Sequence, residues 1–504
     1  MSTRKFSALV VATLLLQSCA ARTTTPAAVA VAPADAAEQL RRELDALFGA
    51  ASVDHVQWGI SFYSVRQNRS LFALNPTRFL IPASNQKLLI ASAAADRLGW
   101  DFRFTTRLLA TGPIRADGML DGDLIVTSNG DPTINTRDPL RWRAFDDWAA
   151  ALKGKGIKAI NGHLIGDDNA FVEPGWGTGW AWDNLQYGYG AQATALQFNE
   201  NQVELLVGPG MHAGAHAIIG MSPAGSGLVI DNRVITVAAG EPTSVDIARL
   251  PGTPYLTVRG QIAVGANPTT EFASVDDPTR FYLNVLRSAL QRHGIAIATG
   301  SLDADTIKPP FVYDALTELF VDRSPPLVEI IDIALKWSRN IYAESILFAL
   351  APPDAPASGP RALRTVGETL AAWGISQDKY LPRDASGLSR YDYVSADTLI
   401  SVLRHMLNDA RHAEKFQSTL PVAGVSGTLA NRMKGTPAEG RVRAKTGTLA
   451  NVRSLSGYAT TLEGDTIVFA MMANNFRVGA AEIDALMERA LVRVITATRT
   501  VLTQ

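Results

Sequence analysis

The stretch from Ile81 to Ala93 reads IPASNQKLLIASA, and its chemistry is concentrated in Ser84 and Lys87. A turn containing Pro82 leads into an apolar, alanine-rich run, which predicts a buried helix with Ser84 near its start. A spacing of three places the Ser84 and Lys87 side chains on one face of that helix. A serine hydroxyl becomes an effective nucleophile when a nearby base takes its proton, so the stretch predicts a nucleophile and its base.

Two further motifs follow along the chain: Ser338-Arg339-Asn340 and Lys445-Thr446-Gly447-Thr448. Together the three segments have the S-x-x-K, S-x-N and K-T-G patterns in order. A second S-x-x-K, Ser376 to Lys379, follows the end of a predicted helix and has polar neighbours, which indicates an exposed loop.

These residue types predict acyl transfer from a peptide that ends in a free carboxylate. Lys87 must be neutralised by burial or by a second cation, and Lys445 could be that cation. Lys445, Thr446 and Thr448 could hold the carboxylate, and backbone N–H groups of Ser84 and Thr448 could form an oxyanion hole. Ser338 could relay a proton between Lys87 and the leaving amine, and Asn340 could hold Lys87 and a substrate amide. Taken alone, Lys445 could be a surface lysine and Asn340 a helix cap.

The N-terminal residues predict export. Arg4 and Lys5 precede a short apolar stretch, so residues 1–18 are interpreted as a signal peptide. Cys19 is the only cysteine, and Leu16-Gln17-Ser18-Cys19 resembles a bacterial lipobox, which predicts lipidation of Cys19 and a periplasmic, lipid-anchored protein. The alternative is an ordinary signal peptide cleaved at Ala20 or later. Residues 19–36, rich in alanine, threonine, proline and valine, are interpreted as a tether.

Composition excludes several other functions. The formal net charge is −1 and no basic run is present, which argues against nucleic-acid binding. His212 and His216 have no evident acidic partner, so no metal site and no cofactor are predicted. With the only thiol at Cys19, the folded part has no redox chemistry.

The pattern of apolar residues predicts an α+β protein. One antiparallel sheet is expected from an N-terminal hairpin and three C-terminal strands, with helices on its faces and a mostly helical region between 327 and 407. Residues 37–102 and 321–504 are interpreted as the catalytic domain, and residues 103–320 as a β-rich insertion of two subdomains. The expected segments of regular structure are helices at 37–49 and 480–496, and strands at 56–65, 70–73, 203–207, 228–230, 255–258, 441–446, 452–460 and 466–473.

Longer segments extend the likeness to a known family. The chain resembles the class C low-molecular-mass penicillin-binding proteins, the D-alanyl-D-alanine carboxypeptidase/endopeptidase family. The segments that carry the resemblance are residues 81–87, 129–133, 338–344, 384–390 and 444–449. Ala385 stands where the family usually has glycine, and Arg339 stands where Asp or Asn is frequent. The resemblance covers nearly the whole chain after the tether and implies a penicillin-binding/β-lactamase-like domain with a long insertion.

The resemblance also implies a function. A family member hydrolyses the terminal D-Ala–D-Ala bond, or D-Ala–diaminopimelate cross-links, of peptidoglycan peptides, and is trapped covalently by β-lactams. The resemblance further implies that Asp167, Phe171, Arg390 and Leu449, with Gly447 of the third motif, line the pocket for the peptide.

Three other classes of protein share part of this pattern. A class A β-lactamase would need a deacylating glutamate in a Glu-x-x-Leu-Asn setting between Ser338 and Lys445, and none is present. A Ser-His-Asp hydrolase would need a histidine base, and no histidine lies in a motif. A non-catalytic penicillin-binding or cell-wall-binding lipoprotein on the same scaffold remains the alternative to an enzyme.

Overall fold

The computed structural model describes residues 33–137, 141 and 143–497. Cys19, the signal peptide and most of the tether lie outside this part of the chain. The end of the tether is corrected, because α1 (Pro33–Phe48) already includes residues 33–36. Among the described residues, no helix has both the length and the apolar character needed to cross a membrane.

A five-stranded antiparallel sheet joins the two ends of the chain. Its strands, in spatial order, are β19 (Val442–Leu449), β20 (Val452–Thr460), β21 (Thr466–Asn474), β1 (Gln57–Ser64) and β2 (Arg69–Leu74). The predicted hairpin and the three predicted C-terminal strands are therefore confirmed as one sheet. β21 is apolar along most of its length because both faces of this sheet are covered.

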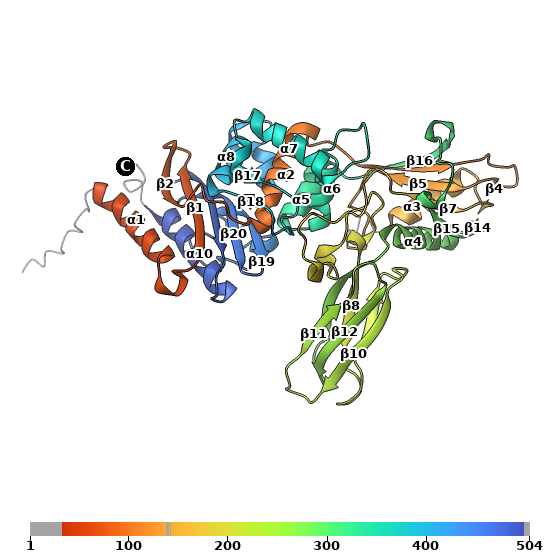
Figure 1. Ribbon diagram of the computed structural model, residues 1–504, viewed down its shortest axis with the longest axis horizontal. Helices are drawn as coiled ribbons and strands as arrows, with labels where there is room; N and C mark the ends of the chain where they lie inside the picture. The colour runs from red at the N-terminus through yellow and green to blue at the C-terminus, as the bar shows by residue number, and fades with distance from the viewer. Residues whose placement is uncertain (1–32, 138–140, 142, 498–504) are drawn as a thin grey trace, which may run out of the picture.

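Helices cover both faces of the sheet. α1 packs on α10 (Ala480–Thr496), which lies against β20, while α8 (Ala396–Asn408) packs on β21 and β1. Figure 1 shows α1 and α10 on one side of the sheet and α8 on the other. The C-terminal helix spans the predicted residues.

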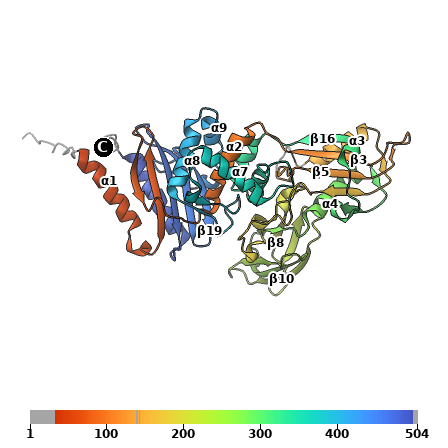
Figure 2. The same ribbon diagram turned by 45° about the horizontal axis from the view of Figure 1, so that its top comes forward.

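A helical subdomain lies between this sheet and the insertion, as both Figure 1 and Figure 2 show. At its centre is α2 (Gln86–Leu98), which contacts α8 and three further helices. The other helices of the subdomain are α5 (Leu327–Lys336), α6 (Asn340–Phe348), α7 (Gly359–Ala372) and the short α9 (Ala413–Ser418). A two-stranded ladder of β17 (Tyr380–Leu381) and β18 (Tyr393–Val394) closes the loop that follows α7. The mostly helical interpretation of residues 327–407 is confirmed.

The insertion between α2 and α5 contains several separate sheets. One lobe holds the sheet β15-β7-β5-β3-β16, the small sheet β14-β6-β4 and helices α3 and α4, and a second lobe holds the sheets β10-β12-β11 and β13-β8-β9 (Figure 1). The bounds in the first lobe are β3 (Thr105–Ala110), β4 (Met119–Leu120), β5 (Leu124–Ser128), α3 (Ala144–Gly154), β6 (Ala159–Ile160), β7 (Leu164–Asp167), α4 (Pro278–Arg292), β14 (Ala296–Ile297), β15 (Ser301–Asp303) and β16 (Thr317–Arg323). Those in the second lobe are β8 (Gln202–Gly208), β9 (Ile218–Ser222), β10 (Val229–Val237), β11 (Ser244–Ala248), β12 (Tyr255–Ala263) and β13 (Thr269–Ser274).

Two details of the insertion differ from the prediction. β16 pairs with β3 and ends at Arg323, so the insertion sheet continues past the predicted boundary at residue 320. α4 was not predicted, although its start carries a clear signal: the Asp277 side chain accepts a hydrogen bond from the backbone N–H of Arg280, and Pro278 occupies the first turn.

Candidate active site

Ser84 lies in a tight turn at the start of α2. Residues Ala83–Asn85 form a single 3-10 turn, and the α-helix begins at Gln86, so Ser84 precedes the helix instead of lying inside it. The turn still brings the predicted pair together, because Lys87 Nζ lies 2.9 Å from Ser84 Oγ. Ala83 has a φ of +47°, a conformation that costs energy for a residue with a side chain and that is frequent at functional sites.

Lys87 is buried and held by three oxygen atoms. Its Nζ donates to Asn340 Oδ1 at 2.7 Å and to the Ser386 carbonyl at 2.6 Å, in addition to its contact with Ser84. Burial lowers the pKa of Lys87 to about 8, although the charges of Asp384, Glu344 and Asp392 act in the opposite direction. The main cause of the lowered pKa is therefore loss of solvent, which is the first of the two causes that the sequence suggested.

Strand β19 approaches the Ser84 turn closely at Gly447. A Cβ at this position would lie 2.0 Å from Ser454 Oγ and 3.0 Å from the backbone nitrogen of Ser84. Only glycine fits there without moving one of these groups. The same contact region includes a hydrogen bond from Asn85 Nδ2 to the Lys445 carbonyl at 3.0 Å, so the third motif is fixed directly against the first.

Lys445 is fully buried and contacts the second motif. Its Nζ donates to Ser338 Oγ at 2.9 Å and to the Thr446 carbonyl at 2.7 Å. Burial, followed by the charge of Lys87, lowers the pKa of Lys445 well below its ordinary value. Thr446 Oγ1 lies 2.8 Å from Thr428 Oγ1, a residue that sequence reasoning missed.

Asn340 links the catalytic cluster to the insertion. It is the first residue of α6, and its Nδ2 donates to the Tyr189 carbonyl at 2.8 Å while its Oδ1 accepts from Lys87. Ser338 has a φ of +58°, so the second motif also contains a strained residue. A cavity of about 310 Å³ adjoins Ser338 and Asn340 and includes Tyr189 and Trp337 in its lining.

The loop after β17 supplies groups that sequence reasoning did not assign. Glu344 accepts hydrogen bonds from the backbone N–H groups of Ala385 and Ser386, the latter at 2.8 Å. Ser386 in turn presents its carbonyl to both Lys87 and Ser84 Oγ, the latter at 3.2 Å. Asp384 accepts the backbone N–H groups of Gly387 and Ser389 within the same loop. The motif resemblance included these residues, but only the fold shows that they shape the surroundings of Lys87.

Of the four pocket residues implied by the resemblance, two lie side by side and the other two lie elsewhere. Arg390 donates from Nη2 to the Ala450 carbonyl at 3.1 Å, which places it beside Leu449 at the end of β19. Phe171 is instead a core residue, with its ring 4.4 Å from that of Phe348.

Asp167 also differs from the expectation. It ends β7 and lines a separate hollow with Asn129 and Tyr313. None of the three motifs contributes to the lining of that hollow. The structure therefore places Phe171 in the core and Asp167 at a separate hollow, whereas the resemblance implies that both line the peptide pocket.

No group of three or more metal-binding side chains occurs within the described residues.

The antiparallel sheet, the helical subdomain and the Ser84–Lys87 cluster together define a penicillin-binding serine peptidase. A sequence profile of the D-Ala-D-Ala carboxypeptidase 3 (S13) family matches residues 40–497, and the chain belongs to that family. It is 32% identical over 453 residues to a D-alanyl-D-alanine carboxypeptidase of an Actinomadura species, covering 86% of this chain and 81% of the relative. It is 29% identical to the D-alanyl-D-alanine carboxypeptidase DacB of Haemophilus influenzae over 83% of this chain and 85% of the relative.

A solved structure supports the same fold. The crystal structure of penicillin-binding protein 4 (dacB) from Haemophilus influenzae matches 90% of this chain and 99% of its own, with a TM-score of 0.79 and 26% identity. A second crystal structure of that protein, in complex with a β-lactam, matches with a TM-score of 0.73. The predicted family, fold class and enzyme class are confirmed.

We predict that Glu344 positions the Ser386 carbonyl and influences Lys87 through its charge. In Glu344→Gln, the backbone N–H groups of Ala385 and Ser386 face an amide in place of a carboxylate, and a negative charge is removed from beside Lys87. Burial raises the pKa of Glu344 to about 8, so its charge develops in the same pH range in which Lys87 titrates. Without that charge the pKa of Lys87 should fall, and the pH midpoint of penicillin acylation should move to lower pH. Stopped-flow acylation rates from pH 5 to 10 measure this midpoint.

The matched control is Glu368→Gln, which makes the same change on the exposed face of α7. It should leave the midpoint where it is. An unchanged midpoint in Glu344→Gln, with only a uniform loss of rate, would contradict the electrostatic role of Glu344.

Proposed function

We propose that this chain is a D-Ala-D-Ala carboxypeptidase that acts on peptidoglycan stem peptides through an acyl-enzyme on Ser84. The observation that carries the proposal is the 2.9 Å contact between Ser84 Oγ and Lys87 Nζ, in a site where burial lowers the pKa of that lysine to about 8. A base whose pKa lies near working pH can accept a proton and later return it.

In the acylation step, neutral Lys87 accepts the proton of Ser84. Its two N–H bonds remain directed at Asn340 Oδ1 and the Ser386 carbonyl, which leaves the nitrogen lone pair for the serine hydroxyl. Ser84 Oγ attacks the carbonyl carbon of the penultimate D-Ala, and the backbone N–H groups of Ser84 and Thr448 stabilise the oxyanion.

Ser338 then gives a proton to the leaving amine. The Lys445 side chain, 2.9 Å from Ser338 Oγ, favours the transient loss of this proton, and the proton that Lys87 took from Ser84 replaces it, so that Lys87 is neutral again. Terminal D-Ala leaves, and a water molecule deprotonated by Lys87 hydrolyses the ester to free Ser84. The same steps apply to a D-Ala–diaminopimelate cross-link, in which the amine belongs to a second peptide.

The peptide and its carboxylate have separate places in this proposal. Thr446 and Thr448 hold the terminal carboxylate, with the Thr428 hydroxyl supporting Thr446. Arg390 and Leu449 flank the stem of the peptide at the end of β19. Asp167 and Phe171 are not proposed as contacts. β-Lactams carry a carboxylate beside a reactive amide, so they acylate Ser84 by the same route.

We predict that Lys445→Ala discriminates between substrates. Lys445 is fully buried, so in this proposal it does not touch the carboxylate. It acts through its charge and through its hydrogen bond to the Thr446 carbonyl. The variant should acylate more slowly with a peptide ending in a carboxylate, by about tenfold or more, than with the matching C-terminal amide. Single-turnover rates for the two peptides give the comparison. Equal losses for both would instead indicate that Lys445 acts on Ser338 or Lys87 alone.

We also predict that Cys19 carries lipid and anchors the mature protein to a membrane on the periplasmic side. The observation is Leu16-Gln17-Ser18-Cys19 after an apolar stretch, with no other cysteine in the chain. Several acyl chains hold a protein firmly to a membrane, whereas one binds only marginally. Mass spectrometry of the mature N-terminus should show an acylated residue 19. An unmodified N-terminus that begins after residue 19 would contradict this prediction.

Release of free D-Ala from a diacetyl-L-lysyl-D-alanyl-D-alanine peptide tests the function. The carboxypeptidase proposal expects turnover that penicillin blocks. The alternative, a non-catalytic penicillin-binding lipoprotein, expects penicillin labelling without any release of D-Ala.

A further inference from the structure

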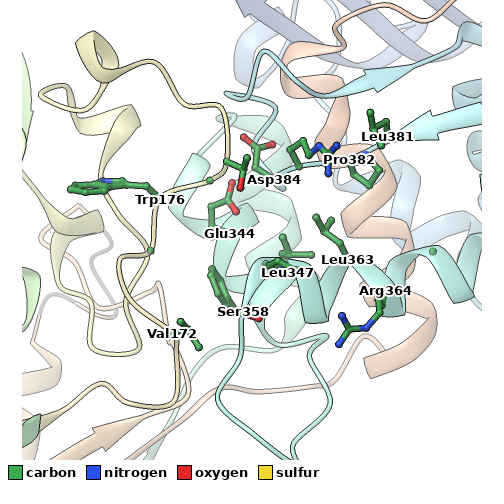
Figure 3. A pocket seen from close by; sticks show the side chains of 18 of the residues that line it. Val172, Trp176, Glu344, Leu347, Ser358, Leu363, Arg364, Leu381, Pro382 and Asp384 are labelled. Atoms are coloured by element: carbon green, nitrogen blue, oxygen red, sulfur yellow. The ribbon is translucent and has the colours of Figure 1, made fainter.

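A second cavity, of about 500 Å³, lies at the junction of the insertion and the helical subdomain. Figure 3 shows it from close by, between the segment that carries Val172 and the helices α6 and α7. None of the five proposed catalytic residues lines this cavity. Its volume is within the range of small-molecule sites in proteins.

The segment that closes one side of the cavity is fixed at both ends. At one end, the backbone N–H of Val172 donates to the Ala357 carbonyl at 2.8 Å, and that of Ala357 donates to the Ala170 carbonyl at 2.8 Å. At the other end, Trp180 Nε1 donates to Asp384 Oδ2 at 2.7 Å. Residues 173–178 run between these two attachments, one made by backbone groups and the other by side chains, so this side of the cavity is fixed at both ends.

The polar groups of the cavity differ from one end to the other. Figure 3 shows Glu344 and Asp384 at one end, Leu347 and Leu363 in the middle and Arg364 at the far end. Both carboxylates are buried and already accept backbone N–H groups of the loop. The two carboxylates therefore already have hydrogen-bond partners within the protein. A ligand can interact instead with the apolar middle of the cavity and with the arginine.

Arg364 is the group best placed to select a ligand. It is exposed, and within the described residues it forms no hydrogen bond or ion pair. The hydrogen bond from Arg361 is the main cause that lowers the pKa of Asp354, and the charge of Arg364 contributes less. The guanidinium of Arg383, another residue of the lining, also has no partner within the described residues. Two unpaired guanidinium groups in a cavity whose apolar lining includes the exposed Val172 and the partly exposed Leu363 fit a carboxylate attached to a small apolar group.

We propose that this cavity is a second peptide site, which binds the carboxylate end of another stem peptide without reacting with it. The proposal rests on the proposed function, because that function places the chain among peptides that end in D-Ala and a free carboxylate. Arg364 takes the carboxylate, and Val172, Leu347 and Leu363 contact the methyl groups. The site is separate from Ser84, with Glu344 and the Ser386 peptide between the cavity and Lys87.

The test uses full-length protein whose Ser84 site is occupied by penicillin, with the adduct checked by mass spectrometry before and after titration. Diacetyl-L-lysyl-D-alanyl-D-alanine is titrated by calorimetry, with its C-terminal amide as the control peptide. The carboxylate peptide should bind with one-to-one stoichiometry. Both the amide and the variant Arg364→Ala should bind about tenfold more weakly or worse.

Two further variants locate the site. Val172→Trp places bulk at the exposed edge of the cavity and should reduce binding without changing the charge. Arg41→Ala removes an exposed guanidinium from α1, far from the cavity in Figure 1, and should leave binding unchanged. No binding to the acylated protein, equal binding of the amide, or binding that is indifferent to both Arg364→Ala and Val172→Trp would each overturn the proposal.

Failure of the proposed function gives a different result. In that case penicillin leaves no adduct on Ser84, or the unmodified protein releases no D-Ala. The Ser84→Ala variant then replaces the acylated protein in the titration. Binding of the carboxylate peptide that weakens in Arg364→Ala would support the second site, and binding that does not depend on Arg364 would overturn it.

Discussion

Ser84→Ala should abolish the release of D-Ala and leave no penicillin adduct on the protein. The residual rate should fall by on the order of 10⁵ to 10⁶, because the whole catalytic unit loses its nucleophile. The fold should persist, since a small side chain replaces another small one and, among the described residues, the hydrogen bonds of Ser84 Oγ join it to Lys87 and the Ser386 carbonyl alone. Steady-state D-Ala release and a thermal melt of the same sample measure the two effects separately.

The second S-x-x-K of the chain is the matched control. Ser376 and Lys379 are exposed, at the short 3-10 turn Gln377–Lys379, as the sequence predicted. Ser376→Ala and Lys379→Ala should each leave both activities within about twofold of the wild-type values, as is usual for surface substitutions. A loss of activity in these variants comparable to that in Ser84→Ala would contradict the assignment.

Lys87 substitutions should have the next largest effect. Lys87→Ala removes the general base and should slow acylation by about 10³-fold or more. Lys87→Arg should not restore activity, since arginine stays protonated and cannot accept the Ser84 proton. Rapid-quench acylation rates with penicillin measure both variants, and substantial rescue by arginine would show that Lys87 acts as a fixed cation and not as a base.

The pH dependence of the wild-type protein belongs to the same prediction. Lys87 accepts a proton only when it is neutral, and burial lowers its pKa to about 8. The acylation rate should therefore rise by about tenfold for each pH unit up to about pH 8 and level off above it. A rate that declines from pH 6 to 8 would have the wrong sign for a lysine base.

Local pattern and motif order were enough to predict that residues of the three motifs lie together. The turn before Leu88, the apolar helix after it and the strand pattern around Lys445 are local features. The expected sheet, built from strands at both ends of the chain, brings the Lys445 strand near Ser84. The sequence could not show that Ser386 and Glu344 complete the surroundings of Lys87. Their contact with it depends on the loop after β17 returning to α2, which is a property of tertiary packing.

The insertion was predicted less well for the same reason. Asp167 and Phe171 were placed in the substrate pocket by resemblance, yet the fold puts one in a separate hollow and the other in the core. Tyr189, whose carbonyl holds Asn340, carries no local signal for that role because any residue has a backbone carbonyl. The start of α4 did carry a signal in Asp277 and Pro278, and no glycine or proline follows Pro278 before Gly294.

The most direct test of the account is to locate the acyl group in the wild-type protein. The protein is labelled with penicillin, quenched, digested and sequenced by tandem mass spectrometry. The account predicts that the adduct lies on Ser84, in the peptide that also contains Lys87. An adduct on Ser376, on Ser338 or on any other residue would contradict it.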